Sequence, residues 1–304
     1  MSDIRTHTVH ANGLDFVVDE AGDGDCVALL LHGFPESRRS WRAQLPALAA
    51  RGWRAVAPDM RGYGGSSRPA ARGDYALDHL IEDAGALFDA LGARRRLLIA
   101  HDWGAIVAWV FAIERTRHLD GLVIMNVPHP AVYLDHIRRS PGQWLKSWYV
   151  LFFQLPWLPE ALLTADRARA VGRSFTQTAI DGSCFTDEII DHYRDNAAAP
   201  GAMTAMINYY RANAGALGRW GPGRAPRIEA PTLMVWGEQD PFLGLALTRG
   251  YKPYVNDLTL VRLPGVSHWV QQEAADRVNA TVGVWLAGRG LIGEPPAAEG
   301  SPLS

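Results

Sequence analysis

The residues most able to do chemistry lie around Asp102. The apolar run Leu97–Ala100 has the length of a strand, a turn of small residues follows it, and the segment from Trp103 to about Arg117 has a helical pattern. Small residues around a central nucleophile, with Gly104 two positions later, are typical of the tight strand-to-helix turn that lifts one side chain above a sheet edge. Asp102 is therefore a candidate nucleophile, although an aspartate at this place is equally typical of a helix N-cap.

Two later segments end in residues that could activate water next to Asp102. The apolar stretch Thr232–Trp236 leads to Asp240, and Leu258–Leu263 leads to His268. In a parallel sheet the carboxyl ends of the strands share one edge, so these side chains would face one crevice. The chain order nucleophile, acid, histidine is also that of a hydrolytic triad. We therefore expect Asp240 to orient His268, and His268 to act as a general base.

The elements that must position these residues alternate between strands and helices up to residue 128, the pattern of a parallel sheet with helices on both faces. The turn signal Asn12-Gly13 adds an antiparallel hairpin at the start of the chain. In chain order we expect strands Thr6–His10, Leu14–Glu20 and Cys26–Leu31, then a helix from about Arg38 to Ala50 and a strand Arg54–Ala57. A helix Leu77–Leu91 follows, then the strand and helix on either side of the turn at Asp102, which we call the elbow, and a strand Leu122–Asn126.

The alternation stops in residues 129–226, which are rich in helical patterns and aromatic residues and are interrupted by prolines. We expect this segment to form a helical cap inserted into an α/β core made of residues 1–128 and 227–294. A closing helix is expected over about Glu273 to Leu286. Residues 295–304 are small, polar and rich in proline, a composition typical of a disordered tail.

The composition narrows the classes of partner. The chain has 304 residues, 48% of them hydrophobic and 20% charged, as in a globular protein with a substantial core. A net charge of -2 gives no reason to expect nucleic acid or an anionic membrane as a partner. Cys26 and Cys184 form neither a disulfide framework nor a metal-binding spacing. With no signal-peptide pattern and no apolar run of spanning length, we expect a cytoplasmic protein.

Five motifs together resemble those of the α/β-hydrolase superfamily and, more narrowly, of the epoxide hydrolases. They are Leu31-His32-Gly33-Phe34-Pro35-Glu36-Ser37, Asp59-Met60-Arg61-Gly62-Tyr63-Gly64, His101-Asp102-Trp103-Gly104, Gly237-Glu238-Gln239-Asp240 and Gly265-Val266-Ser267-His268. The resemblance covers almost the whole chain except the tail. Haloalkane and haloacetate dehalogenases share the elbow aspartate, so this residue does not identify the substrate class. The residues of the cap must distinguish the classes.

The resemblance implies that two cap tyrosines assist the opening of an epoxide ring. The segments Trp148–Pro156 and Asn208–Arg211 are similar to those that carry the two tyrosines, and matching them residue by residue selects Tyr149 and Tyr210. Tyr209 is the alternative to Tyr210. A phenol, with a reference pKa of about 10, stays protonated at neutral pH and can donate to an oxygen on which negative charge develops.

The implied reaction has two steps and needs no metal or organic cofactor. Asp102 attacks a carbon of a small neutral or apolar epoxide to form an ester, and water activated by His268 hydrolyses that ester. The backbone N–H groups of Phe34 and Trp103 would stabilise the oxyanion. The residues expected to line the substrate pocket are His32, Pro35, Trp103 and Trp269. The sequence leaves the oligomeric state open.

Several positions separate this hypothesis from its alternatives. Phe34 stands where haloalkane dehalogenases usually have a polar residue in contact with halide, and Trp103 and Ile106 stand where haloacetate dehalogenases would have arginines. Asn126 occupies a place where some relatives keep the charge-relay acid, which favours Asp240 for that role. A haloalkane dehalogenase remains the main alternative. A non-enzymatic ligand receptor, which often lacks part of this catalytic set, ranks below it.

Overall fold

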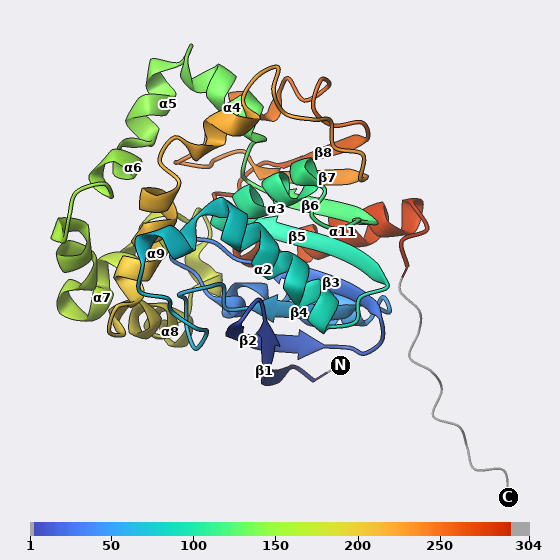
Figure 1. Cartoon of the computed structure of the whole chain (residues 1–304), viewed down its shortest axis with the longest axis horizontal. Helices are drawn as coiled ribbons and strands as arrows, with labels where there is room; N and C mark the ends of the chain where they lie inside the picture. The colour runs from blue at the N-terminus through green and yellow to red at the C-terminus, as the bar shows by residue number, and fades with distance from the viewer. Residues whose placement is uncertain (1–2, 293–304) are drawn as a thin grey trace, which may run out of the picture.

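The computed structural model describes residues 3–292, which form one eight-stranded sheet with helices on both faces (Figure 1). The strand order is β1-β2-β4-β3-β5-β6-β7-β8, and only the β1–β2 and β2–β4 pairs are antiparallel. The strands are β1 (Arg5–Ala11), β2 (Leu14–Ala21), β3 (Cys26–Leu31), β4 (Arg54–Pro58), β5 (Arg95–His101), β6 (Gly121–Met125), β7 (Thr232–Gly237) and β8 (Leu258–Leu263). The predicted fold class is confirmed, and the predicted tail, residues 295–304, lies outside the described residues.

Local sequence explains why the strands form where they do. Asn12 and Gly13 both have positive φ angles, 49° and 72°, as the tight hairpin turn between β1 and β2 requires. Every residue of β3 is buried, in agreement with its unbroken apolar sequence and its place between two parallel neighbours. The predicted bounds of β3 and β8 match the observed ones.

The predicted helix from Arg38 to Ala50 is wrong in its first half. The structure has a short 3-10 helix at Arg38–Trp41 and begins the α-helix α1 only at Gln44–Ala49. The backbone N–H and the guanidinium of Arg38 both bind the buried carboxylate of Asp59. This tertiary contact fixes the first turn against β4, and helical periodicity alone could not reveal it.

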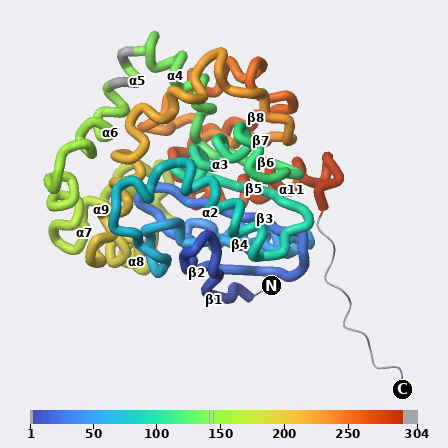
Figure 2. The backbone as a smooth tube through the Cα atoms, in the orientation of Figure 1, coloured from blue at the N-terminus to red at the C-terminus, as the bar shows by residue number. Residues whose placement is uncertain are grey.

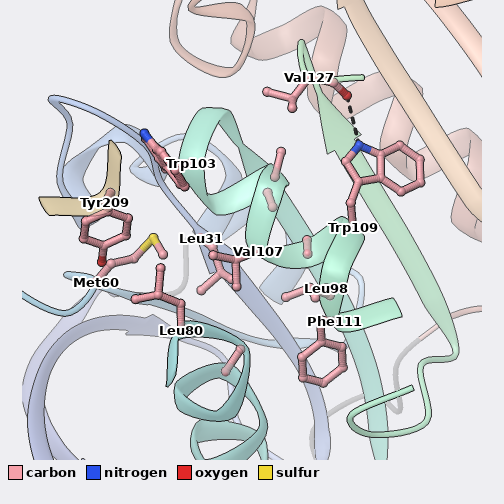
Figure 3. Packing of buried hydrophobic residues seen from close by; sticks show 14 of the residues in the cluster. Leu31, Met60, Leu80, Leu98, Trp103, Val107, Trp109, Phe111, Val127 and Tyr209 are labelled. Carbon is pink, nitrogen blue, oxygen red and sulfur yellow. Dashed lines mark hydrogen bonds between the residues drawn. The ribbon is translucent and has the colours of Figure 1, made fainter. Parts of the chain in front are cut away.

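Helices cover the two faces of the sheet in separate layers (Figures 1 and 2). α2 (Leu77–Ala90) and α3 (Asp102–Glu114) pack on one face, and α1 and α11 (Ala275–Gly288) pack on the other. Figure 3 shows the first layer, where the indole N–H of Trp109 on α3 donates to the carbonyl oxygen of Val127 at 3.0 Å. This bond ties α3 to the segment that follows β6, so two strand ends near the predicted site are held together.

Between β6 and β7 the chain forms helices and no strand, and Figures 1 and 2 show α5, α6 and α7 along the outer rim of the molecule. We use the name cap for these helices, residues 130–220. They are α4 (Pro130–Ile137), α5 (Pro141–Lys146), α6 (Trp148–Phe152), α7 (Leu158–Thr178), the 3-10 helix η3 (Gly182–Cys184), α8 (Asp187–Ala198), α9 (Ala202–Ala212) and the 3-10 helix η4 (Ala216–Trp220). Non-helical backbone at residues 165–168 kinks α7. The cap therefore consists of separate helical segments, and its longest helix, α7, is bent.

The described chain also bears on anchoring and on metal binding. Across residues 3–292 we find no helix with both the length and the apolar character to cross a bilayer. In the same part of the chain no three or more His, Cys, Asp and Glu side chains are grouped so that they could hold a metal ion. Cys26 and Cys184 are both free thiols.

Candidate active site

The turn from β5 into α3 presents Asp102 in a strained conformation. Its φ angle is +47°, in the left-handed region that side chains other than glycine rarely adopt. Two glycines make room for it: a Cβ at Gly33 would lie 2.2 Å from the Asp102 Cβ, and one at Gly104 would lie 2.2 Å from the Leu31 carbonyl oxygen. The small residues of the motif are therefore required by close backbone contacts. The Asp102 side chain keeps 16% exposure, so a small molecule can reach it.

The two carboxylate oxygens of Asp102 have different surroundings. Oδ1 accepts a hydrogen bond from the backbone N–H of Phe34 at 2.7 Å, and Oδ2 lies 3.7 Å from Nε2 of His268. The N–H of Trp103 lies in the first turn of α3, where a helix has no internal acceptor for it. Burial raises the pKa of Asp102, but the positive charge of His268 at 3.7 Å, with smaller contributions from His101 and Phe34, lowers it overall. The carboxylate is thus ionised at neutral pH.

His268 and Asp240 form a short buried pair. Nδ1 of His268 lies 2.6 Å from Oδ2 of Asp240, and neither residue is more than 4% exposed. Burial lowers the pKa of His268, but the carboxylates of Asp240 and Asp102 outweigh burial and raise it to about 10. In the resting protein the imidazole is therefore protonated, and it lies between two anions.

A buried glutamate, Glu36, lies next to the loop of residues 32–35, which carries the Phe34 N–H, and the sequence patterns did not single it out. Oε2 of Glu36 lies 2.8 Å from Nδ1 of His101 and accepts from the N–H of Gly33 at 3.2 Å. Its Oε1 accepts from the side-chain amides of Gln271 and Gln272 at 2.8 and 2.7 Å. Burial raises the pKa of Glu36, but the charge and hydrogen bond of His101 lower it overall. The carboxylate therefore fixes the loop that presents the Phe34 N–H.

His101 connects that glutamate to the loop that carries His268. Its Nε2 lies 2.9 Å from the carbonyl oxygen of His268, while Nδ1 faces Glu36. A carbonyl oxygen and an ionised carboxylate can only accept, so both ring nitrogens are placed to donate. These two contacts fix the ring of His101 directly before Asp102. The motif His101-Asp102 suggested proximity, but the contact with Glu36 depends on the fold.

The structure brings the two predicted cap tyrosines together. The rings of Tyr149 on α6 and Tyr210 on α9 have centroids 6.1 Å apart and planes at 82°. Tyr210 also packs edge-on against Phe34 at 5.5 Å and against Trp103 at 5.0 Å. Phe34 donates its N–H to Asp102, and Trp103 follows Asp102 in the chain. Burial first, and then the charge of Asp102, raises the pKa of both phenols well above the usual value. Both therefore remain protonated donors.

Tyr209, the alternative to Tyr210, faces the opposite way. It is fully buried, and its hydroxyl donates to the carbonyl oxygen of Arg61 at 2.8 Å. Its ring packs against Tyr63 at 5.4 Å, and Figure 3 shows it beside Met60. The hydroxyl of Tyr209 is thus committed to the protein interior, and of the two neighbours only Tyr210 packs against both Phe34 and Tyr149.

The predicted pocket lining needs a correction at His32. This side chain is fully buried, and its Nε2 accepts from the N–H of Met60 at 3.0 Å. It therefore supports the loop of residues 32–35 from within the protein and offers no surface to a ligand. Pro35 is also buried. Trp269 is only 2% exposed, and its indole donates to Thr178 on α7 at 2.8 Å, which ties the base loop to the cap. Of the predicted lining residues, Trp103 remains next to the site.

A mostly parallel sheet with an acid after β5, an acid after β7 and a histidine after β8 defines the class of α/β-hydrolases. Residues 28–275 match the family model described as the alpha/beta hydrolase fold. Human Epoxide hydrolase 4 is 39% identical over 281 residues, which cover 90% of this chain and 76% of that protein. Epoxide hydrolase A of Mycobacterium tuberculosis is 32% identical, with 92% of this chain and 96% of that protein covered.

The solved structures agree with the curated relatives. The crystal structure of the Bacillus megaterium epoxide hydrolase in complex with an inhibitor superposes with a TM-score of 0.85 at 26% identity, and covers 92% of this chain and 100% of that one. Epoxide hydrolase A from Mycobacterium thermoresistibile superposes with a TM-score of 0.80 at 31% identity, over 94% of this chain and 99% of that one. The chain belongs to the α/β-hydrolase fold family and, within it, to the epoxide hydrolases.

Proposed function

We propose that this protein hydrolyses an epoxide to a vicinal diol through a covalent ester on Asp102. The observation that carries the proposal is the asymmetry of the Asp102 carboxylate. Oδ1 is held by the Phe34 N–H at 2.7 Å, whereas Oδ2 faces His268 at 3.7 Å. The held oxygen is suited to become the ester carbonyl, and the other oxygen is suited to attack.

Ring opening is assisted from the cap. A bond forms between Oδ2 of Asp102 and an epoxide carbon, while the bond from that carbon to the ring oxygen breaks and its electron pair stays on the oxygen. A phenol of Tyr149 or Tyr210 donates a proton to this oxygen, because an unassisted alkoxide is a poor leaving group. The high pKa of both phenols supports this role, since neither ionises before the substrate binds.

Ester formation prepares His268 for the second step. The charge of Asp102 is one of the causes that hold the pKa of His268 at about 10. The ester is neutral, so the pKa of His268 falls once Asp102 has been alkylated. His268 then gives up its proton more readily, and the phenolate left by ring opening needs one. Neutral His268 is the general base for the next reaction.

Hydrolysis of the ester completes the cycle. His268 takes a proton from water through Nε2, and the hydroxide attacks the carboxyl carbon of Asp102. The backbone N–H groups of Phe34 and Trp103 stabilise the oxyanion on Oδ1. Collapse of this intermediate expels the diol oxygen, which takes the proton back from His268. Asp102 is released as the carboxylic acid and passes its proton to the now neutral His268, so the carboxylate and the imidazolium of the resting protein are both restored.

The surroundings of Asp102 favour a neutral, apolar substrate. Phe34 and Phe153 pack with ring centroids 5.3 Å apart, Phe153 contacts Tyr210 at 4.8 Å, and Phe242 lies 5.2 Å from the ring of His268. Aromatic rings of this kind bind apolar groups and leave the two phenols as the polar handles.

Product analysis of the purified protein tests this function. The wild type and Asp102→Asn are incubated with a panel of small alkyl and aryl epoxides and with 1-haloalkanes of the same carbon skeletons. We expect the wild type to release diols from epoxides and no halide from haloalkanes, and Asp102→Asn to do neither. Halide release without diol formation would establish a dehalogenase. Ligand binding without any turnover would indicate a receptor.

A further inference from the structure

We propose that Asn126 is a positioning residue for the hydrolysis step, because its carboxamide ties together the strand ends that carry Asp240 and His268. The inference rests on the proposed function. It gives a role to a residue that takes no direct part in either of the two reaction steps. Asn126 follows β6 directly and is fully buried. In the sequence, Asn126 was notable only because some relatives have the charge-relay acid at this place.

Three hydrogen bonds connect the side chain of Asn126 to the neighbouring segments. Its Oδ1 accepts from the N–H of Gly237, the last residue of β7, at 2.7 Å. Its Nδ2 donates to Oδ2 of Asp240 at 2.7 Å and to the carbonyl oxygen of Ser267 at 3.3 Å. Ser267 directly precedes His268. One side chain thus bridges the end of β6, the end of β7 and the loop after β8.

The partners determine which way the carboxamide points. A backbone N–H only donates, so the oxygen of Asn126 must face Gly237. A carboxylate and a carbonyl oxygen only accept, so the NH₂ group must face Asp240 and Ser267. An aspartate here would place a second negative oxygen against Asp240 and another acceptor against the Ser267 carbonyl. The position therefore requires an amide rather than an acid.

The backbone around Asn126 leaves little room for adjustment. Its φ angle is +48°, in the left-handed region that asparagine and glycine tolerate best. At the partner position, a Cβ on Gly237 would lie 2.0 Å from the Ser267 carbonyl oxygen. The end of β7 and the loop after β8 thus approach each other backbone to backbone at the place that the carboxamide bridges. The bridge therefore holds two segments that are already in close contact.

The effect on His268 passes through Asp240. Oδ1 of Asp240 accepts from the N–H groups of Phe242 and Leu243 at 2.7 and 2.8 Å, and Oδ2 is shared between Asn126 and Nδ1 of His268. These four donors prevent the carboxylate from rotating. Nδ1 of His268 therefore keeps its proton, and Nε2 stays directed toward Asp102. Loss of the Asn126 amide removes one of the four donors and loosens the general base.

Single-turnover kinetics of the full chain separate this role from a general structural one. We compare the wild type with Asn126→Gly, which keeps the left-handed backbone, and with Asn126→Asp, which keeps the size but loses the donor. Ester formation and ester hydrolysis are followed by quenched-flow intact mass. We expect ester formation within about threefold of wild type and hydrolysis slowed about 10- to 100-fold, since misplacing a catalytic group by about 1 Å costs up to about 10²-fold. The ester should accumulate in both variants.

Asn279→Ala is the matched control. Asn279 lies on α11, and its amide donates to the carbonyl oxygen of Ala43 at 3.0 Å, away from the catalytic residues. We expect this variant to keep the wild-type ratio of the two rates. Equal loss of both rates in the Asn126 variants, or no loss in either, would overturn the proposal.

A second measurement does not depend on epoxide turnover. The Nδ1 proton of His268, bound to a carboxylate at short distance, should give a low-field proton NMR signal in the resting protein. We expect Asn126→Asp to shift or abolish this signal and Asn279→Ala to preserve it. An unchanged signal in Asn126→Asp would contradict the positioning role. If the wild type forms no ester from any epoxide, the proposed function fails, and this signal still decides the role of Asn126.

Discussion

The two sides of the site are held by different forces. On the sheet side, Asp102, Asp240 and His268 stand at strand ends and are fixed by directional hydrogen bonds of 2.6 to 2.8 Å. On the cap side, Tyr149 and Tyr210 are packed among aromatic rings at centroid distances of 4.8 to 6.1 Å. Hydrogen bonds between specific atoms therefore fix the sheet side, whereas contacts between aromatic rings hold the cap side.

This difference matches the parts that the two sides play in the proposed reaction. Proton transfer through His268 needs a fixed tautomer and a fixed direction, which hydrogen bonds from strand ends supply. A phenol that meets an incoming epoxide needs its proton and an approximate direction, which ring packing supplies while leaving room for different substrates. We therefore expect changes on the sheet side to act on every epoxide alike, and changes on the cap side to depend on the substrate.

The largest effect is expected at the nucleophile. In the proposed reaction the charge of Asp102 attacks the epoxide, and Asp102→Asn removes this charge while it keeps the shape of the side chain. Diol formation should therefore fall by at least about 10⁴-fold for every epoxide tested. Initial rates of diol release measure this. Asp15→Asn, a change at an exposed aspartate, should leave the rates at the wild-type level. Substantial turnover by Asp102→Asn would exclude Asp102 as the nucleophile.

The next effect concerns the cap. Tyr149→Phe and Tyr210→Phe each remove one donor, worth about 1 to 3 kcal/mol, so ester formation should slow about 10- to 100-fold while ester hydrolysis continues. Rates for a small and a bulky epoxide would show whether the loss varies with the substrate.

Tyr209→Phe is the control for these two variants. It removes the bond to the Arg61 carbonyl, so it should lower the free energy of unfolding by about 1 kcal/mol and leave both catalytic steps near wild type. Greater catalytic loss in Tyr209→Phe than in Tyr210→Phe would reverse the assignment of the cap tyrosines.

The last effect is one of stability rather than of rate, and it concerns the sheet side alone. The pKa of His268 is about 10 in the folded protein and about 6.5 in an unfolded chain, so its hydrogen bond to Asp240 and its ion pair with Asp102 stabilise the fold fully below pH 6.5. This contribution, on the order of a few kcal/mol, is lost as the pH rises from 6.5 to 10. Urea unfolding at pH 6, 8 and 10 should show the stability difference between wild type and His268→Gln shrinking with pH. A constant difference would contradict the raised pKa.

Sequence reasoning predicted the parts of this molecule that local pattern determines. Continuous apolar runs located β3 and β8, and the strand ends located Asp102, Asp240 and His268, because period and turn chemistry are local properties. It missed the break after Trp41, where a tertiary ion pair overrides the helical pattern.

The residues behind the catalytic groups were beyond the same reasoning. The side chains of Glu36 and Asn126 contact residues that lie up to 236 positions away in the chain. No spacing in the sequence carries that information, and the only hint was that an asparagine stood where an acid was possible. His32 was assigned to the pocket because of its motif, whereas its hydrogen bonds place it beneath the loop.

Oxygen tracing tests the covalent ester most directly. The protein, in excess over the epoxide, is allowed a single turnover in H₂¹⁸O, and both the diol and the peptide that contains Asp102 are analysed by mass spectrometry. The ester mechanism transfers Oδ2 of Asp102 to the diol and replaces it with an oxygen from water. We therefore predict an unlabelled diol and ¹⁸O in the carboxylate of Asp102. A labelled diol with an unlabelled Asp102 would contradict the account, because water would then have attacked the epoxide directly.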